Sequence, residues 1–261
     1  MTYWQGLVLG VVQGLTEFLP ISSSGHLVVA QAAVGLEVPG VRVEVVLHVA
    51  TLLAVVVVYR ERLWELVRGV GSGRREAWAY IGLLAVGSIP AGAVGFLFAD
   101  FFERVFDSLP AVGVSFLVTG GILWTTRWTK ARAHRPVPRA GGAFGIGVGQ
   151  ALAIFPGISR SGTTVAAGLW LGVDPVRAAE FSFLLAIPAI AGAAGLQAME
   201  LGEGVTGVGG GPLAVSFAAA LISGVAAIRL LVALLRRQAF HRFAPYCWIL
   251  GVVTLIWAVV G

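Results

Sequence analysis

Long apolar runs dominate the chain and predict its secondary structure. Six of them approach the roughly 20 apolar residues that an α-helix needs to cross the hydrocarbon core of a bilayer. These runs are Val43–Tyr59, Ala77–Ala99, Leu109–Thr126, Ala178–Met199, Pro212–Leu235 and Ala244–Val260. The pattern predicts an all-α integral membrane protein that forms one membrane domain over 1–261, with six full transmembrane helices.

Two further pairs of apolar stretches are short for a span and are broken by clusters of Pro, Ser and Gly. They are Tyr3–Leu19 with Leu27–Leu36, and Ala143–Phe155 with Thr164–Leu171. Irregular backbone at membrane depth is tolerated only where protein or a water-filled cavity surrounds it. Each pair is therefore predicted to form a re-entrant helical hairpin, over residues 3–36 and 143–172.

The two interruptions carry the same segment written twice. GVVQGLTEFLPISSSG (Gly10–Gly25) and GVGQALAIFPGISRSG (Gly147–Gly162) align without a gap, 137 positions apart. Three differences involve reactive side chains, in the aligned pairs Glu17/Ile154, Ser23/Arg160 and His26/Thr163. We therefore expect an internal duplication, with repeat one over 1–127 and repeat two over 140–261, in which the copies supply different groups to one site.

Composition supports the membrane assignment and excludes other classes. The chain is 57% hydrophobic and 12% charged, with a mean hydropathy of +0.89, whereas soluble domains have about a quarter charged residues. The net charge of +5 comes from residues in membrane-flanking loops and forms no continuous patch, so nucleic-acid binding is rejected. The single cysteine, Cys247, excludes an intrachain disulfide framework.

Charge in the loops predicts the topology. The arginine-rich loops 60–76, 127–139 and 236–242 are expected in the cytoplasm by the positive-inside rule, and the acidic loops 100–108 and 200–211 outside. Six spans then place both termini outside. The first hairpin enters from the outer face and the second from the cytoplasm, so the repeats have inverted topology. Inverted repeats with broken helices place their polar site near the bilayer midplane.

The second copy has the composition of a phosphate-binding turn. Glycine lets backbone N–H groups approach a ligand, a helix N-terminus supplies a positive dipole, and arginine can bind two phosphate oxygens. An arginine at the tip of an intramembrane hairpin is costly and by default functional. The candidate phosphate-binding residues are Gly157, Ser159, Arg160, Ser161 and Thr164. The alternative, that the hydroxyls cap and pack the helix, stays open for Ser161 and Thr163.

The first copy carries groups suited to catalysis. Gln13 and Glu17 lie four apart on one helix face, and such a carboxylate can bind a divalent cation, position a nucleophile or act as a base. Ser22, Ser23 and His26 begin the returning helix. The alternative is that Ser22 caps the helix and His26 bonds nearby backbone. Opposite a phosphate-binding turn, however, Glu17, Ser23 and His26 are expected to be catalytic, with Ser22 on the phosphate.

Three other polar residues of the spans receive structural interpretations. Glu44 and Glu180 begin their spans at equivalent places in the two repeats, and a structural role is favoured for both. His48 could relay protons, but a lone histidine one turn into a span is more often a packing residue.

Three motifs carry a family resemblance over nearly the whole chain. They are GLTEFLPISSSGH (Gly14–His26), PGISRSGTT (Pro156–Thr164) and AAEFSFLLAIP (Ala178–Pro188). Together they closely resemble the bacitracin-resistance family of undecaprenyl-diphosphate phosphatases. The resemblance implies a bacterial inner-membrane enzyme that hydrolyses undecaprenyl diphosphate to the monophosphate and inorganic phosphate. This reaction recycles the lipid carrier for cell-wall polymers and confers bacitracin resistance.

The resemblance also implies residue roles. The essential glutamate of the family corresponds to Glu17, its serine and histidine candidates to Ser23 and His26, and its phosphate-binding motif to Ser159, Arg160 and Thr164. A divalent cation, Mg²⁺ or Ca²⁺, is implied as well, with Glu17 and Gln13 as its ligands. Many members have a second glutamate where this chain has Gln13, which can ligate through its carbonyl oxygen but brings no charge.

Several alternatives remain open at this point. The nucleophile is Ser23, His26 or a water held by Glu17 or the metal. A transporter or flippase of a lipid phosphate is the rival function, because midplane hairpins are a transporter architecture. The acid-phosphatase-like lipid phosphatases are set aside, because Ala166 stands where that class needs histidine. The site is expected to open to the outer face, the partners to be the polyprenyl diphosphate and membrane lipid, and a homodimer is one expected assembly.

Overall fold

The computed structural model describes residues 1–33, 41–98, 101–102, 105, 108–129, 135–199 and 209–260. Within these ranges the chain is helical, and the only β-pairing is one isolated bridge between Arg135 and Val173. The helices are α1 (Tyr3–Phe18), α2 (Ser23–Ala33), α3 (Val41–Val58), α4 (Arg60–Gly71), α5 (Arg75–Leu97), α7 (Leu109–Thr125), η1 (Thr126–Trp128), α8 (Ala140–Leu152), α9 (Arg160–Trp170), α10 (Pro175–Met199), α11 (Gly210–Arg236), η2 (Phe240–Phe243) and α12 (Ala244–Val260). The all-α prediction is confirmed.

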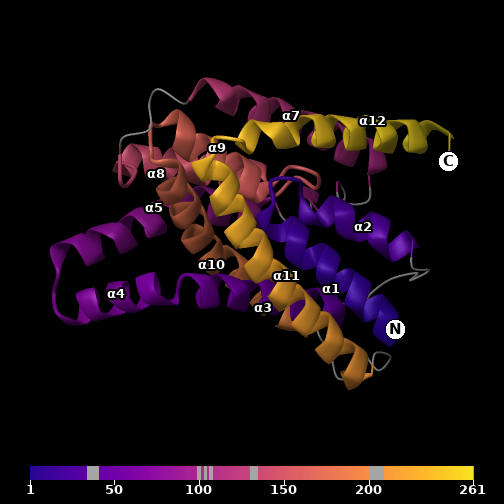
Figure 1. Cartoon of the computed structure of the whole chain (residues 1–261), viewed down its shortest axis with the longest axis horizontal. Helices are drawn as coiled ribbons and strands as arrows, with labels where there is room; N and C mark the ends of the chain where they lie inside the picture. The colour runs from indigo at the N-terminus through magenta and orange to yellow at the C-terminus, as the bar shows by residue number, and fades with distance from the viewer. Residues whose placement is uncertain are drawn as a thin grey trace.

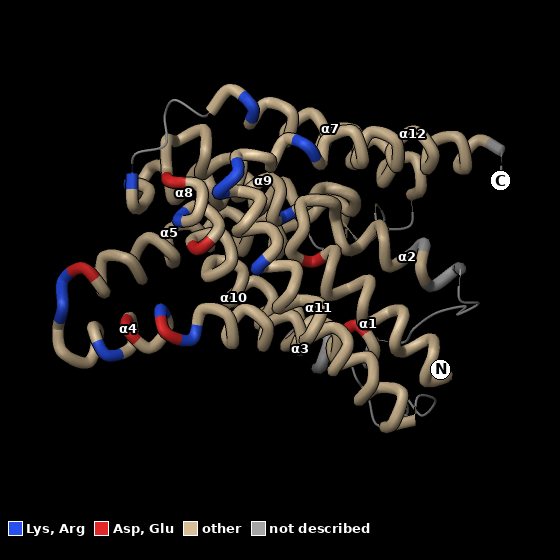
Figure 2. Tube along the Cα trace, viewed as in Figure 1, with Lys and Arg blue, Asp and Glu red and all other residues tan. Residues whose placement is uncertain are grey.

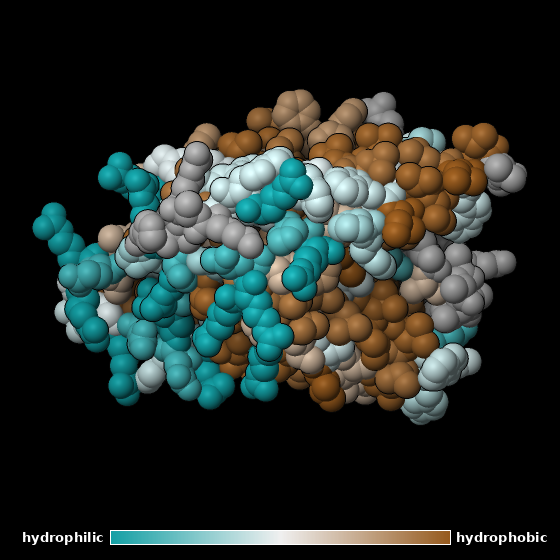
Figure 3. Space-filling view, turned by 45° about the horizontal axis from the view of Figure 1, so that its top comes forward, coloured by the Kyte–Doolittle hydropathy of each residue, from teal (hydrophilic) through white to brown (hydrophobic). Residues whose placement is uncertain are grey.

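The long apolar runs form the long helices of the molecule. Five described helices are long and apolar enough to cross a membrane, and α3 with α4 makes a sixth if the bent pair counts as one span. Large apolar side chains project from their outer sides, among them Phe96, Ile222, Ile249 and Val259. Apolar surface covers a large part of the face that Figure 3 shows, on the side away from the hydrophilic end. Because exposed apolar surface of this extent requires an apolar surrounding, the multi-pass membrane prediction is confirmed.

The basic segment 60–76, which we expected as a loop, is instead largely helical. Helix α4 leaves α3 at a bend of 75°. It buries Leu66 and Gly69 on one side, while Trp64 and Val67 are exposed. Arg68 lies over the ring of Trp64, 4.8 Å from its centroid. A helix with arginine, tryptophan and one buried apolar side is typical of the membrane–water interface, so the loop expectation was wrong for a physical reason.

Charged residues gather at one end of the molecule. Figure 2 places the arginines of α4, of the start of α8 and of the end of α11 at the end opposite the two chain termini, which lie at the same end in Figure 1. The hydrophilic surface in Figure 3 is concentrated at that arginine-rich end. Lys130, Arg132 and the acidic residues of the loops 100–108 and 200–208 lie outside the described residues.

The two repeated segments fold into two helix–turn–helix pairs, α1 with α2 and α8 with α9. Helix α1 packs along α11, and α8 packs along α5. Gly10 in α1 lies against the backbone oxygen of Ser216, and its repeat partner Gly147 in α8 lies against that of Gly87. A Cβ atom at either glycine would overlap this oxygen, so glycine permits the close helix approach that small residues give in membranes.

Candidate active site

The turn of the first helix pair brings a carboxylate and a hydroxyl together. Helix α1 ends at Phe18, and α2 begins at Ser23. Between them Ser22 has a φ of 67°, in the left-handed region that non-glycine residues seldom adopt. This reversal lets the Ser23 hydroxyl donate a hydrogen bond of 2.6 Å to Oε2 of Glu17. A nucleophile and a base in direct contact are a signature of covalent catalysis.

The turn of the second pair is fixed to α7. Gly157 has a φ of 91°, and a side chain there would also overlap the Val112 carbonyl oxygen. Thr119 of α7 donates to the Gly157 carbonyl at 3.0 Å and accepts from the Ser159 backbone N–H at 3.1 Å. The Ser159 hydroxyl then caps α9 by accepting from the Gly162 N–H. These bonds set Arg160 as the first residue of α9.

The two turns meet through an ion pair between Glu17 and Arg160. Nη2 of Arg160 bonds Oε1 of Glu17, while Oε2 accepts from Ser23 and, at 3.1 Å, from Gln13. The Ser161 hydroxyl adds a second connection, because it donates to the Leu19 carbonyl at 3.0 Å. We predicted that Glu17 and Arg160 come together from two distant segments, and the structure places them in direct contact.

These groups line a cavity of about 400 Å³. Its polar residues are Gln13, Thr16, Glu17, Ser22, Ser23, Ser24, Glu44, His48, Ser159 and Arg160. Its apolar residues are Leu27, Ala153, Ile154, Ile158, Ala189, Ile190 and Ala193. The cavity thus combines an ionic part with an apolar part, which suits a ligand that has a charged head and a hydrocarbon tail.

Arg160 retains hydrogen-bonding capacity after it has paired with Glu17. Its Nη1 atom is buried and has no hydrogen-bond partner among the residues that the structure describes. A buried N–H without an acceptor is unfavourable by about 1–3 kcal/mol and calls for an explanation. At the N-terminus of α9, beside the helix dipole, the missing acceptor is best supplied by an anion.

The predicted phosphate-binding residues divide into two groups. Ser22, Ser159 and Arg160 line the cavity. Gly157, Ser161 and Thr164 are not among its lining residues, and the Thr164 hydroxyl instead bonds the Arg160 carbonyl and the Ser182 hydroxyl, each at 2.6 Å. In this conformation the second group fixes the turn and the start of α9.

His26 is also absent from the cavity lining, although it is close to the site in sequence. Its Nδ1 is 2.7 Å from the Ser22 carbonyl oxygen, and its Nε2 is 2.6 Å from the hydroxyl of Tyr246 in α12. The alternative that His26 bonds nearby backbone is therefore realised, and sequence reasoning missed its partner Tyr246.

The sequence analysis also did not predict that Glu44 and His48 belong to the site. Both line the cavity with Glu17, and Nδ1 of His48 bonds the Glu44 carbonyl oxygen at 2.9 Å. Their spacing of four, one turn along α3, was a signal that both lie on one face. That this face meets the site depends on how α3 packs against α10 and α11, which the sequence does not state.

Glu180 has the structural role that we predicted. Its carboxylate accepts from Arg62 at 3.0 Å and from Arg177 at 2.9 Å, which ties α4 to α10. Burial is the largest single effect on Arg62 and lowers its pKa, but the Glu180 carboxylate, together with Glu65 and Tyr80, outweighs burial, so the pKa of this guanidinium is raised.

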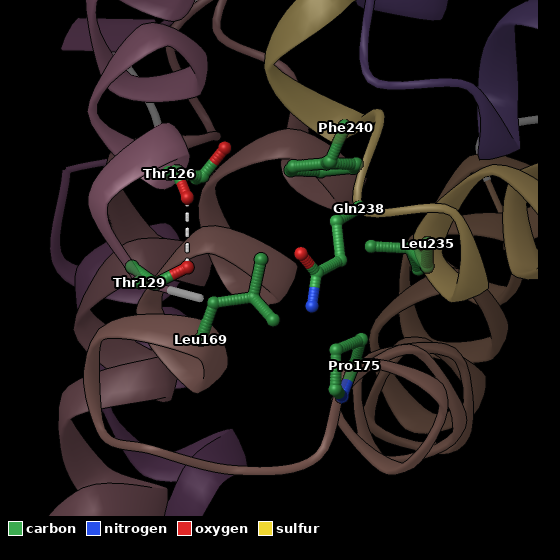
Figure 4. Close-up of a pocket in the computed structure, with 7 residues that line it drawn as sticks. All are labelled: Thr126, Thr129, Leu169, Pro175, Leu235, Gln238 and Phe240. Carbon is green, nitrogen blue, oxygen red and sulfur yellow. Dashed lines mark hydrogen bonds between the residues drawn. The ribbon is translucent and has the colours of Figure 1, made fainter. Parts of the chain in front are cut away.

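A second, smaller cavity of about 20 Å³ lies near the ends of α9 and α11 (Figure 4). The Gln238 side chain projects into it, and the Thr129 hydroxyl bonds the Thr126 carbonyl at its edge. Its volume suits about one water molecule, and none of the described residues that line it is charged. The catalytic candidate is therefore the larger cavity.

The cavity also has the chemistry of a hard-cation site. Among the described residues, no three His, Cys, Asp or Glu side chains are grouped so as to hold a metal ion. Gln13, Glu17 and Glu44 nevertheless bring oxygen donors to one cavity. Mg²⁺ is often held by one or two carboxylates together with substrate phosphates. The donor set therefore fits Mg²⁺ or Ca²⁺ that a phosphate ligand helps to bind.

Comparisons with known proteins identify the family of the chain. The family described as "Bacitracin resistance protein BacA" matches residues 6–253. A protein of Desulfosudis oleivorans named "Undecaprenyl-diphosphatase" is 44% identical, over 96% of this chain and 97% of its own. Proteins of the same name from Carboxydothermus hydrogenoformans and Parabacteroides distasonis are 38% and 39% identical and are covered over 99% and 98% of their length. The chain belongs to the bacitracin resistance protein BacA family.

Proposed function

We propose that this protein hydrolyses undecaprenyl diphosphate to undecaprenyl phosphate and inorganic phosphate at the cavity between the two turns. The observation that carries the proposal is the Glu17 carboxylate, which accepts from the Ser23 hydroxyl on one oxygen and from Arg160 on the other. The relatives named for this activity support the choice of substrate. Recycling of the lipid carrier and bacitracin resistance follow as consequences of the reaction.

The contacts favour Ser23 as the nucleophile. Its hydroxyl oxygen attacks the terminal phosphorus while Glu17 takes its proton. The bond from this phosphorus to the bridging oxygen breaks, and the electron pair leaves with undecaprenyl phosphate. Glu17 releases the proton to solvent and then accepts one from the water that attacks the phosphoserine. Ser23 recovers a proton from Glu17 as inorganic phosphate departs.

Arg160 supplies positive charge where the phosphoryl group is transferred. Its unpartnered Nη1 offers a donor to a phosphate oxygen, and the N-terminus of α9 adds backbone dipoles. Phosphoryl transfer depends mainly on such positioning and charge stabilisation. The further phosphate ligands that we propose are Ser22 and Ser159 from the cavity wall, with Gly157, Ser161 and Thr164 shaping the turn that presents them.

A divalent cation, Mg²⁺ or Ca²⁺, is part of the proposal. Glu17, Gln13 and the newly placed Glu44 would hold it. When bound, such a cation would neutralise charge on the diphosphate.

The first helix of each hairpin packs against a helix of the other repeat, and this arrangement supports the proposed inverted repeat. Helix α1 of the first half packs on α11 of the second, and α8 of the second packs on α5 of the first. The third spans, α7 and α12, pack on each other. A two-fold axis that relates repeat one, 1–127, to repeat two, 140–261, accounts for this pattern. The pairs α1–α2 and α8–α9 are then the two re-entrant hairpins that meet near the midplane.

The charge distribution supports the proposed orientation in the inner membrane. The arginine-rich end would face the cytoplasm, so both termini would be outside, and the cavity would open to the outer face. Oriented intact vesicles with the lipid diphosphate added to one leaflet test this choice. Hydrolysis only from the cytoplasmic leaflet would contradict it. The homodimer stays a prediction.

Phosphate release from detergent-solubilised protein tests the proposed function. We expect release from undecaprenyl diphosphate by the wild type and its loss in Glu17→Ala and Arg160→Ala. Glu61→Ala, which alters an exposed carboxylate of α4, is the matched control and should remain active. Absence of release by a folded wild type would favour the rival, a transporter of lipid phosphates, because detergent removes membrane sidedness but not hydrolysis.

A further inference from the structure

The hydrogen bonds of His26 fix the state of its ring. The Ser22 carbonyl can only accept, so the Nδ1 of His26 carries a proton and donates to it. In the neutral ring, Nε2 then has a lone pair, which accepts from the hydroxyl of Tyr246. The nitrogen that could attack phosphorus is therefore covered by Tyr246.

Aromatic contacts hold the same ring from two sides. The Tyr246 ring lies nearly parallel to the His26 ring, with an interplanar angle of 10° and centroids 5.7 Å apart, and meets it through the hydroxyl. The Phe116 ring of α7 meets it edge-on, with centroids 5.8 Å apart. Gly25 lies against Phe116, where a Cβ atom would overlap the ring. Helices α2, α7 and α12 thus hold the imidazole in one orientation.

The Ser22 carbonyl that receives the His26 N–H belongs to the turn next to Ser23. Ser22 has a positive φ, a backbone conformation that is unfavourable for a non-glycine residue and persists only where its surroundings fix it. Ser22 is buried. The next residue is Ser23, whose hydroxyl bonds Glu17. The His26 bond therefore stabilises the backbone that sets the direction of the Ser23 side chain.

We infer that Tyr246 and His26 are positioning residues: Tyr246 holds the His26 ring, and His26 holds the Ser22 turn that presents Ser23 to Glu17. The inference rests on the proposed function and deepens it, because it assigns His26 a backbone contact in place of nucleophilic attack. It also assigns a role to Tyr246, a residue of α12 that is 220 positions away in sequence.

Two amide substitutions of His26 test the inference. The side-chain nitrogen of asparagine occupies the place of Nδ1 and can donate to the Ser22 carbonyl, whereas that of glutamine occupies the place of Nε2 and cannot. We expect His26→Asn to retain phosphate release within about 10-fold of wild type, the worth of about one hydrogen bond. His26→Gln and His26→Ala should lose about 100-fold or more of kcat.

Tyr246→Phe is a second test, because it keeps the aromatic ring and removes only the hydroxyl. It should lower kcat several-fold in the wild type, with little change in KM, and should have no effect when added to His26→Asn, which has no Nε2 to lose. Such non-additivity is expected of two residues that act through one contact. If Tyr246→Phe acted through a general loss of stability, it would instead lower kcat by the same factor in the wild type and in His26→Asn.

Nitrogen NMR of ¹⁵N-histidine-labelled protein in detergent gives a readout that does not depend on activity. The His26 signals, assigned by their loss in His26→Asn, should report a protonated Nδ1 and an Nε2 whose resonance moves in Tyr246→Phe. Equal inactivity of the folded His26→Asn and His26→Ala proteins, or radiolabelled phosphate on His26, would overturn the inference. An inactive wild type would instead refute the proposed function, while the NMR signals would still decide the Tyr246 contact.

Discussion

Glu17 and Arg160, 143 positions apart, form the ion pair that joins the two turns of the repeated segment. Each is costly where it lies, because a buried charge that loses its partner costs about 3–5 kcal/mol. In the ligand-free protein each neutralises the other. A diphosphate that enters the cavity can take over Arg160 and leave Glu17 available as a base.

Arg160→Lys tests whether the fork of the guanidinium is needed. Lysine keeps the charge but carries its N–H donors on a single nitrogen and cannot bind Glu17 and a phosphate oxygen through two nitrogens of a planar fork, so kcat/KM should fall by about 100-fold or more. Steady-state phosphate release measures this. Arg236→Lys, at the arginine-rich end, is the control and should match wild type. A fall of only a few-fold in Arg160→Lys would mean that charge alone suffices.

Trapping of phosphate on the protein identifies the nucleophile. In single-turnover reactions with substrate labelled at the terminal phosphate, quenching in a denaturing detergent at neutral pH, which preserves both phosphoserine and phosphohistidine, should leave label on the wild type and none on Ser23→Ala. His26→Asn should still be labelled. Label that survives in Ser23→Ala but is lost in His26→Ala would exclude the serine.

Gly157→Ala tests the backbone of the second turn. Alanine would be strained at a φ of 91° and would overlap the Val112 carbonyl, so the free energy of unfolding should fall by at least about 1–3 kcal/mol. Thermal unfolding in detergent measures the change. The control is Gly82→Ala in α5, where nothing lies within 4 Å of the added Cβ. If both variants unfold alike, the turn is not held as described.

Thr119→Val removes the hydroxyl that fastens α7 to the same turn. It leaves the buried Ser159 N–H and Gly157 carbonyl without this partner, which should cost about 1–3 kcal/mol of stability and lower activity. Thr254→Val is a matched control, because in the part of the chain that the structure describes its buried hydroxyl bonds only the Leu250 carbonyl of its own helix. Equal unfolding temperatures for the two variants would contradict the proposed fastening.

Removal of divalent cations tests the metal proposal. EDTA should abolish phosphate release, and Mg²⁺ or Ca²⁺ should restore it. Glu44→Gln should raise the cation concentration needed for half activation by about 10-fold, on the scale of other changes around metal sites. Glu61→Gln should leave this concentration unchanged. Full activity in EDTA would refute the cation requirement.

Much of the architecture was predictable because it follows from local patterns of apolar residues and from the repeated segment. Apolar runs gave the spans, because each helix must present some 20 apolar residues to lipid whatever its neighbours are. The repeat then suggested that Glu17 and Arg160 meet, since aligned copies occupy equivalent places. The helical form of α4 was missed because its arginines were interpreted as loop charges, although they alternate with Leu66 and other apolar residues at helical spacing.

The remainder depends on packing that no local pattern records. Tyr246 reaches His26 only because α12 lies close to the first turn, and no motif connects the two residues. Likewise, whether a hydroxyl such as Thr164 faces the cavity or the neighbouring helix depends on the rotation of α9 by less than half a turn. The sequence therefore indicates which residues lie near the site, but which of their side chains point into the cavity depends on how the helices pack.

The pairing of α1 with α11 has a consequence for how the protein assembles. Glu17 belongs to α1, which is synthesised well before α11, the helix along which it packs. Until α11 is inserted, the close contact of Gly10 with the Ser216 backbone cannot form, and α1 lacks the helix along which it packs. The reactive centre should therefore form late in biogenesis, so that a truncated or half-inserted chain would have all of its nucleophilic groups and still be inert.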